Sequence, residues 1–92
     1  MKYHFLGKTG VQVSCLCMGT MTFGKEADEA ASALMYQRCR EAGINFFDTA
    51  DVYSEGLSET LLGQFIQGER QQLILASKAY FQIGKDINQR GT

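Results

Sequence analysis

The chain contains no proline, no tryptophan and only one histidine among its 92 residues. It also lacks any apolar run approaching the roughly 18 residues that a membrane-spanning helix requires. Residues 1–5 have neither the apolar core nor the small-residue cleavage site of a signal peptide. From these absences we expect a cytoplasmic protein that does not act at a membrane.

Clusters of positive charge and of metal-binding side chains are also missing. The formal net charge is −1, so nucleic acid is not an expected partner. The three cysteines, Cys15, Cys17 and Cys39, form no C-x-x-C pair, which argues against a disulfide framework and against a metal site. Cys15 and Cys17 lie two apart in an apolar run. We therefore expect them on one face of a strand, as small buried hydrophobic residues rather than a redox pair.

What the chain does have is a regular alternation of strand and helix patterns. Residues 3–6 and 11–13 flank a turn with two glycines, which predicts a hairpin. Apolar runs at residues 15–20, 44–48 and 73–77 are typical of strands in a parallel sheet. Helix patterns over residues 28–42 and 58–68 separate these runs. This order predicts an α/β fold whose consecutive strands are neighbours in one parallel sheet.

Each predicted helix has an apolar stripe and end signals. Asp28 and Ser58 are the expected N-caps, and Gly43 and Gly68 are the expected stops. The first stripe comprises Ala31, Leu34, Met35, Cys39 and Ala42, and the second comprises Leu61, Leu62, Phe65 and Ile66. Two helices cannot cover both faces of so apolar a sheet, and three parallel strands leave two unpaired edges. The sequence therefore predicts an incomplete sheet.

Three chemically useful side chains follow the ends of the second and third apolar strands. Asp48 and Lys78 stand at the carboxyl ends of these strands, and Tyr53 comes shortly after Asp48. Ligands of α/β proteins bind at that edge of the sheet. Free phenols lose their proton only near pH 10, but a neighbouring ammonium favours the phenolate. Tyr53 is therefore a candidate general acid toward a carbonyl oxygen. The alternative is an ordinary ion pair at the rim, with Tyr53 in a packing role.

Four stretches carry a resemblance to a known family. Residues 43–63 read GINFFDTADVYSEGLSETLLG, residues 18–24 read MGTMTFG, residues 75–78 read LASK, and residues 6–14 read LGKTGVQVS. The first resembles the signature of the aldo-keto reductases, and the others resemble the first-strand motif, the third-strand motif and the floor hairpin of that family. Among its members, the bacterial branch related to potassium-channel β subunits is the most similar.

The resemblance implies a fold, a reaction and a set of site residues. The fold is the N-terminal third of a (β/α)₈ TIM barrel, with residues 1–14 as the floor hairpin and residues 15–92 as a βαβαβ unit. The reaction is NADPH-dependent reduction of a small aldehyde or ketone. Tyr53 matches the catalytic acid, Lys78 the lysine that favours its ionised form, and Asp48 the carboxylate that orients this lysine. The residues implied in cofactor binding are Gly19, Thr20, Met21 and Asp48.

The resemblance also implies that part of the site lies outside these residues. The family's fourth catalytic residue is a histidine on the next strand, whereas His4 belongs to the floor hairpin and is expected to be structural. A (β/α)₈ barrel usually needs about 250 residues. We therefore expect residues 1–92 to be inactive alone, with residues 87–92 in a loop that leads to a third helix. The alternative is a non-catalytic, truncated or cofactor-sensing protein of the same family.

One further motif almost matches a different chemistry. Residues 19–25 fit G-x-x-x-x-G-K, the start of a phosphate-binding loop. Glu26 then stands where a serine or threonine would hold magnesium, and its carboxylate would repel the phosphates. No G-x-G-x-x-G follows the first apolar strand, so a dinucleotide-binding fold of that type is not expected either. A nucleotide hydrolase remains the weaker alternative.

Overall fold

A computed structural model describes residues 1–89 of the chain, and residues 90–92 lie outside the described part. The prediction of a loop over residues 87–92 therefore falls partly outside it. The strands are β1 (Tyr3–Phe5), β2 (Gln12–Ser14), β3 (Met18–Gly19), β4 (Phe46–Asp48) and β5 (Ile74–Ala76). The helices are α1 (Glu29–Glu41) and α2 (Leu57–Phe65), with short 3₁₀ segments at Tyr53–Gly56 and Arg70–Gln72.

The strands form a hairpin and a separate parallel sheet. β1 and β2 pair antiparallel, with Tyr3 opposite Ser14. The sheet has the order β3-β4-β5, and both of its pairs are parallel. The predicted neighbours and directions are confirmed, although each strand is shorter than its apolar run.

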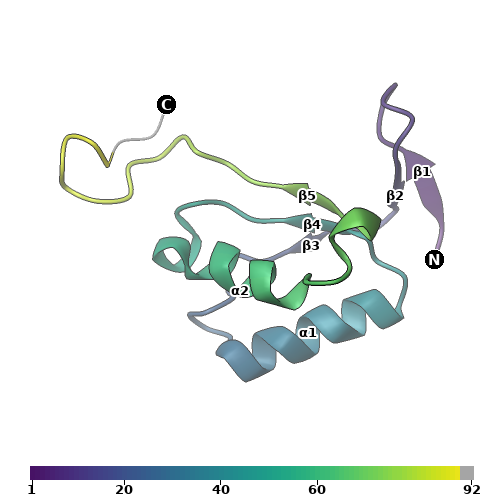
Figure 1. The fold of residues 1–92 in the computed structure, drawn as a ribbon, viewed down its shortest axis with the longest axis horizontal. Coiled ribbons are helices and arrows are strands. Elements are labelled where there is room, and N and C mark those ends of the chain that lie inside the picture. The colour runs from purple at the N-terminus through teal and green to yellow at the C-terminus, as the bar shows by residue number, and fades with distance from the viewer. Residues whose placement is uncertain (90–92) are drawn as a thin grey trace.

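Both helices lie on the same side of the sheet, as Figure 1 shows. The core between them contains Tyr36 of α1, Phe47 of β4 and Leu62 of α2. Met18 of β3 and Leu75 of β5 pack against this cluster. Because side chains alternate along a strand, Met18, Phe47 and Leu75 mark the covered face of the sheet. The residues on either side of them in the sequence belong to the opposite face.

The ends of α1 agree with the sequence prediction, but its buried side does not. Asp28 caps the helix by accepting a hydrogen bond from the Ala31 backbone N–H at 2.8 Å. The predicted stripe is rotated by about one residue, because Ser32 and Tyr36 are the buried positions and Leu34 is 52% exposed. The Tyr36 ring packs 5.2 Å from the Phe47 ring, measured between centroids, and this contact sets the rotation of the helix.

The predicted stripe of α2 is confirmed, but its predicted N-cap is wrong. Leu61, Leu62 and Ile66 are buried as expected. The helix begins at Leu57, after Gly56 in the left-handed conformation (φ +97°), and no side chain caps it. Ser58 lies inside the first turn, fully buried, where its hydroxyl has other partners.

The expectation that Cys15 and Cys17 are buried is also wrong. Both side chains are exposed, and so is that of Leu16 between them. The strand predicted over residues 15–20 is reduced to Met18–Gly19. Before β3 the chain is still in the turn that leaves the hairpin, where the Cys15 backbone N–H donates to the Lys2 carbonyl. This turn keeps the cysteines out of the covered face.

The hairpin is attached at the amino ends of the parallel strands. The Asn45 side chain, just before β4, accepts a hydrogen bond from the Ser14 backbone N–H at 2.8 Å. The Tyr3 hydroxyl donates to the Gly43 carbonyl at 2.7 Å. The hairpin therefore lies at the opposite end of the sheet from Asp48. His4 is exposed on β1, away from Asp48.

The second face of the sheet carries no helix within residues 1–89. Phe46 and Asp48 of β4, and Ile74 and Ala76 of β5, alternate onto this face and are only partly buried. After β5 the chain runs away from the sheet (Figure 1). The incomplete sheet predicted from the sequence is therefore observed, and the part of the chain described here does not close into a barrel. None of its helices has the length and apolarity needed to span a membrane.

Candidate active site

The three predicted catalytic side chains meet at the carboxyl ends of β4 and β5. Asp48 is the last residue of β4 and lies opposite Ala76 of β5. Lys78 comes two residues after Ala76, so the alternation of the strand directs it to the same open face as Asp48. The Lys78 ammonium lies 2.8 Å from the Asp48 carboxylate and 3.2 Å from the Tyr53 hydroxyl.

The Lys78 ammonium uses all of its hydrogen-bonding capacity in these contacts. It donates to Asp48 Oδ2 at 2.8 Å, to the Thr49 backbone carbonyl at 2.9 Å and to the Tyr53 hydroxyl at 3.2 Å. An ammonium has three donors and no acceptor. Its three hydrogens thus have three partners, which fix the position of the amine over the Tyr53 ring, 4.9 Å from the ring centroid.

The direction of the contact between Lys78 and Tyr53 decides what the phenol can do. Because the ammonium can only donate, the Tyr53 oxygen is the acceptor. The hydroxyl hydrogen must then point elsewhere, and no acceptor for it lies among residues 1–89. The Tyr53 side chain is therefore held through its oxygen, and its hydroxyl hydrogen makes no hydrogen bond to residues 1–89.

Electrostatics at this site favour the charged form of the lysine. Hydrogen bonding to Asp48, and then to Tyr53, raises the pKa of Lys78 above its ordinary value of 10.5. Asp48 and Lys78 are both substantially exposed, with side-chain exposures of 36% and 48%. Exposed ion pairs stabilise a fold little. The pair therefore fixes the geometry of the site more than it stabilises the fold.

The predicted cofactor loop follows β3 beside this cluster. A Cβ atom added at Gly19 would meet nothing within 4 Å, and Met21 is 62% exposed. Thr20 between them is fully buried, and its backbone N–H donates to the Asp48 carbonyl at 3.0 Å. The loop thus offers an open surface at Gly19 and Met21 and is held to β4 through Thr20.

A buried cluster of hydroxyl groups, which the sequence reasoning did not predict, supports this loop. Ser58 of α2 lies 2.9 Å from Thr20 Oγ1 and 3.0 Å from Thr49 Oγ1, and it donates to the Thr20 carbonyl at 2.7 Å. All three side chains are at least 96% buried. The sequence feature that could have predicted this cluster is a threonine directly after each of two strands, Thr20 after β3 and Thr49 after β4. The cluster ties the ends of β3 and β4 to α2, directly behind Asp48.

Cys17, which precedes β3, lies near the Asp48–Lys78 pair. Although the Cys17 side chain is exposed, the surrounding protein removes enough water from the thiol to raise its pKa; the Asp48 carboxylate raises this pKa further, and the Lys78 ammonium lowers it. The thiol therefore lies within the electrostatic field of the ion pair. Within residues 1–89 no three His, Cys, Asp or Glu side chains are grouped so as to hold a metal ion.

Comparisons with known proteins agree with this geometry. The sequence profile of the Aldo/keto reductase family matches residues 15–91. An uncharacterized oxidoreductase of Bacillus subtilis is 42% identical over an alignment of 87 residues that covers 87% of this chain and 27% of that protein. A probable voltage-gated potassium channel subunit beta of Oryza sativa is 38% identical over 94 residues, covering 99% of this chain and 29% of that protein.

A solved structure extends the similarity to the fold. An aldo-keto reductase of Bacillus halodurans, in its holo form, superposes with a TM-score of 0.80 at 40% identity over 94% of this chain and 29% of that one. The chain therefore spans less than a third of the length of these relatives. Its partial parallel sheet corresponds to the first part of their (β/α)₈ barrel. A family profile that matches most of the chain, together with this superposition, shows that the chain belongs to the aldo/keto reductase family of oxidoreductases.

Proposed function

We propose that this chain contributes the proton-donating part of an active site that reduces small aldehydes or ketones with NADPH. The observation that carries the proposal is the arrangement of the Tyr53 hydroxyl, which accepts from Lys78 and has an unused hydrogen. A carbonyl oxygen that approaches Tyr53 from the open face would meet that hydrogen. General acids that work in this way must lie within hydrogen-bonding distance of the atom they protonate.

The surface around the Asp48–Lys78 pair fits a flat cofactor ring. The space beside Gly19 is open, Met21 is exposed next to it, and Asp48 borders the same surface. When bound, the nicotinamide would supply the hydride for the reaction. Gly19, Met21 and Asp48 would line its position, and Thr20 would hold the loop in place through its buried hydrogen bonds.

The three side chains then divide the work of the proton transfer. The carbonyl oxygen would gain negative charge as its carbon is reduced, and Tyr53 would transfer its hydroxyl proton to that oxygen to give the alcohol. The phenolate that remains is stabilised by the Lys78 ammonium at 3.2 Å. Asp48 holds the ammonium and balances its charge. Because Tyr53 is only partly buried, solvent returns the proton after each turnover.

We further propose that residues 1–92 act as the N-terminal third of a complete barrel and are inactive alone. The open face of the sheet supports this proposal, since Phe46, Ile74 and Ala76 remain partly exposed on the face that no helix covers within residues 1–89. A site open to bulk water does not exclude water from the reacting atoms.

The rival proposal is a family member that binds the cofactor without turning over a substrate. The similarity to a probable voltage-gated potassium channel subunit beta favours it, because that relative covers 99% of this chain. The two proposals share every contact at Asp48, Tyr53 and Lys78. They differ in whether the carbonyl compound is consumed.

The test requires a complete barrel, by which we mean a protein that carries residues 1–92 as its N-terminal third. Either a longer natural product or a chimera on the Bacillus halodurans reductase would serve. Oxidation of NADPH is followed by absorbance, with an aromatic aldehyde as substrate. We expect turnover that Tyr53→Phe slows by roughly 10²–10⁴-fold and that Tyr80→Phe leaves unchanged, since Tyr80 is exposed beyond β5.

Two results would decide against parts of this proposal. Full activity of Tyr53→Phe would show that Tyr53 is not the proton donor. Tight NADPH binding, measured by fluorescence, without consumption of any aldehyde would favour the cofactor-sensing alternative.

A further inference from the structure

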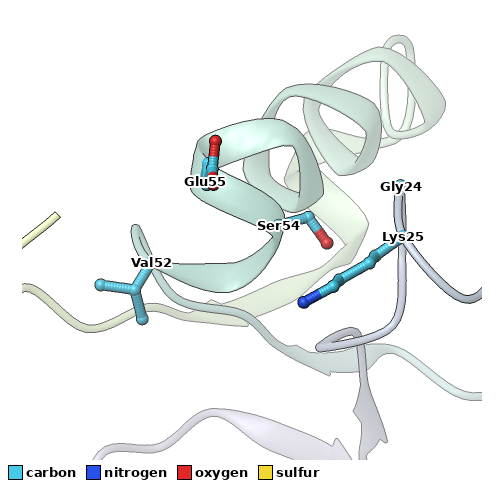
Figure 2. A pocket seen from close by; sticks show the side chains of 5 residues that line it. All are labelled: Gly24, Lys25, Val52, Ser54 and Glu55. Atoms are coloured by element: carbon cyan, nitrogen blue, oxygen red, sulfur yellow. The ribbon is translucent and has the colours of Figure 1, made fainter. Parts of the chain in front are cut away.

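A pocket of about 300 Å³ opens next to Tyr53 and is separate from the Asp48–Lys78 pair. Its walls come from the loop after β3 and from the turn after β4 (Figure 2). The lining residues are Gly24, Lys25, Val52, Ser54 and Glu55. Val52 and Ser54 are the neighbours of Tyr53 in the chain. Tyr53 itself does not line the pocket, but the residues before and after it in the chain do.

The backbone at this pocket adopts a conformation that ordinary residues avoid. Ser54 and Glu55 have φ angles of 51° and 55°, and they are the only residues other than glycine with positive φ within residues 1–89. Side chains in the left-handed region cost roughly 1–2 kcal/mol each. Such strain gathers at functional sites, where the surrounding structure enforces it. Here it directs the Ser54 hydroxyl toward Lys25, as Figure 2 shows.

The Ser54 hydroxyl lacks the partner that a buried polar group needs. Its oxygen is buried and has no hydrogen bond within the described residues. The same holds for Asp51 Oδ1, but Asp51 does not line the pocket. Leaving a buried polar group unpaired is costly, so such atoms call for an explanation. A ligand atom in the pocket would supply the missing partner of Ser54 once a small shift of the pocket wall exposes this oxygen, whose accessible area is below 1 Å².

Lys25 brings a positive charge into the same space. Its side chain extends across the pocket in Figure 2, with the amine toward Ser54 and Val52. The Lys25 ammonium has no ion pair and no hydrogen bond to any of residues 1–89. The carboxylate of Glu55 lines the pocket as well, but Figure 2 shows its side chain directed away from the Lys25 amine. Two donors therefore share this side of the pocket.

We propose that this pocket binds an oxyanion, a carboxylate or phosphate group, carried by the carbonyl substrate. The Lys25 ammonium and the Ser54 hydroxyl donate to the anion's oxygens. Hydrogen bonds that join an ammonium to an anion are stronger than neutral ones. The proposal rests on the carbonyl-reducing function proposed above, and it names the substrate class: an aldehyde or ketone with an acidic group at its far end.

The test measures binding, so it does not depend on turnover. The ligands are alcohols, the products of the proposed reaction, prepared in matched sets that end in a carboxylate, a phosphate or a neutral carboxamide at several chain lengths. Isothermal titration calorimetry on the complete barrel with NADP gives the dissociation constants. We expect the best anion to bind roughly 10-fold more tightly than the carboxamide of equal length.

Variants then assign this preference to the pocket. Lys25→Met should abolish the preference, and Lys25→Arg should restore most of it. Ser54→Ala should weaken it by a smaller factor. Lys8→Met is the matched control, because Lys8 lies in the hairpin turn at the other end of the sheet and its loss changes the net charge equally. We expect Lys8→Met to keep the preference.

The outcomes separate this inference from the proposed function. An anion preference that Lys25→Met removes supports the pocket, even if no aldehyde is consumed and the proposed reaction fails. Equal binding of anion and carboxamide at every length overturns the inference, even in a protein that reduces aldehydes rapidly. A preference that survives Lys25→Met also overturns it, because the charge would then come from elsewhere.

Discussion

Replacing Ser58 by alanine should destabilise the protein far more than replacing a second, equally buried serine. Ser58 has three hydroxyl contacts, to Thr20 Oγ1, Thr49 Oγ1 and the Thr20 carbonyl. Ser32 of α1 has one, to the Ala27 carbonyl at 3.1 Å. Both serines are fully buried in helices. Comparing the two alanine variants therefore separates the stability contributed by the hydroxyl cluster from the effect of removing one buried oxygen atom.

The expected cost follows from counting protons. The three hydroxyls of the cluster have three hydrogens, but four contacts connect them to each other and to the Thr20 and Asp48 carbonyls. At most three contacts are hydrogen bonds at one time. In one arrangement that uses every hydrogen, Thr20 donates to the Asp48 carbonyl, Ser58 to the Thr20 carbonyl, and Thr49 to Ser58. In the other, Thr20 donates to Ser58 instead, and it can turn to the Asp48 carbonyl when Ser58 is replaced.

Ser58→Ala then removes two hydrogen bonds and leaves the Thr49 hydroxyl without a partner. The Thr20 carbonyl keeps the Phe23 backbone N–H as a donor. One lost bond costs about 1 kcal/mol, and an unsatisfied buried hydroxyl costs a further 1–3 kcal/mol, so the total is about 3 kcal/mol. Ser32→Ala loses one bond, and the Ala27 carbonyl keeps the Gly24 N–H. Its cost should be about 1 kcal/mol.

Urea denaturation of the complete barrel, followed by circular dichroism, measures the free energy of unfolding of each variant. We expect the two serine variants to differ by about 2 kcal/mol. If Ser58→Ala costs no more than Ser32→Ala, the hydroxyl cluster does not hold the strand ends to α2, and the reasoning is wrong.

Two other predictions concern stability and charge. Gly24→Ala should destabilise the protein by about 1–2 kcal/mol, because φ at Gly24 is +87° and the new Cβ would lie 2.6 Å from Leu57 Cγ. Gly63→Ala is the contrasting change, because a Cβ at this position in α2 would meet nothing within 4 Å. It should stabilise the protein by about 0.5–1 kcal/mol in the same urea assay. Contact with Asp48 raises the pKa of Lys78 in the folded protein above its ordinary value of 10.5. The stability that this contact contributes is therefore fully present below pH 10.5 and is lost as the pH rises through the pKa of the folded state. Nuclear magnetic resonance titration of the lysine should show a lower midpoint in Asp48→Asn, and an unchanged midpoint would contradict the assigned cause.

The sequence predicted the elements well because their apolar patterns are local. The hairpin, three parallel strands and two helices follow from turn residues and from spacings of two, three and four. The rotation of α1 could not be predicted, because Ser32 is polar and the burial of Tyr36 depends on its ring contacts with Phe47 and Phe65, which are far away in the sequence. The exposure of Cys15 likewise depends on where the hairpin leaves the sheet.

The sequence predicted only those parts of the site that follow from the positions of the strand ends. Asp48 and Lys78 could be placed together because carboxyl ends of adjacent parallel strands share an edge. The role of the exposed loop at Gly19 in cofactor binding was predicted only from the family resemblance. The pocket beside Tyr53 could not be foreseen, since Ser54 and Glu55 are residue types that seldom adopt positive φ, and no sequence pattern announces that they do.

The most direct test of the central claim is a double-mutant cycle on hydride transfer in the complete barrel. Rates are measured in single turnovers for the parent protein, for Tyr53→Phe, for Lys78→Met and for the double variant. If Lys78 acts through the Tyr53 proton, each single change slows the reaction by roughly 10²–10⁴-fold, and the double variant is no slower than Tyr53→Phe alone. A double variant slowed by the product of the two factors would contradict the account, because the two residues would then act independently.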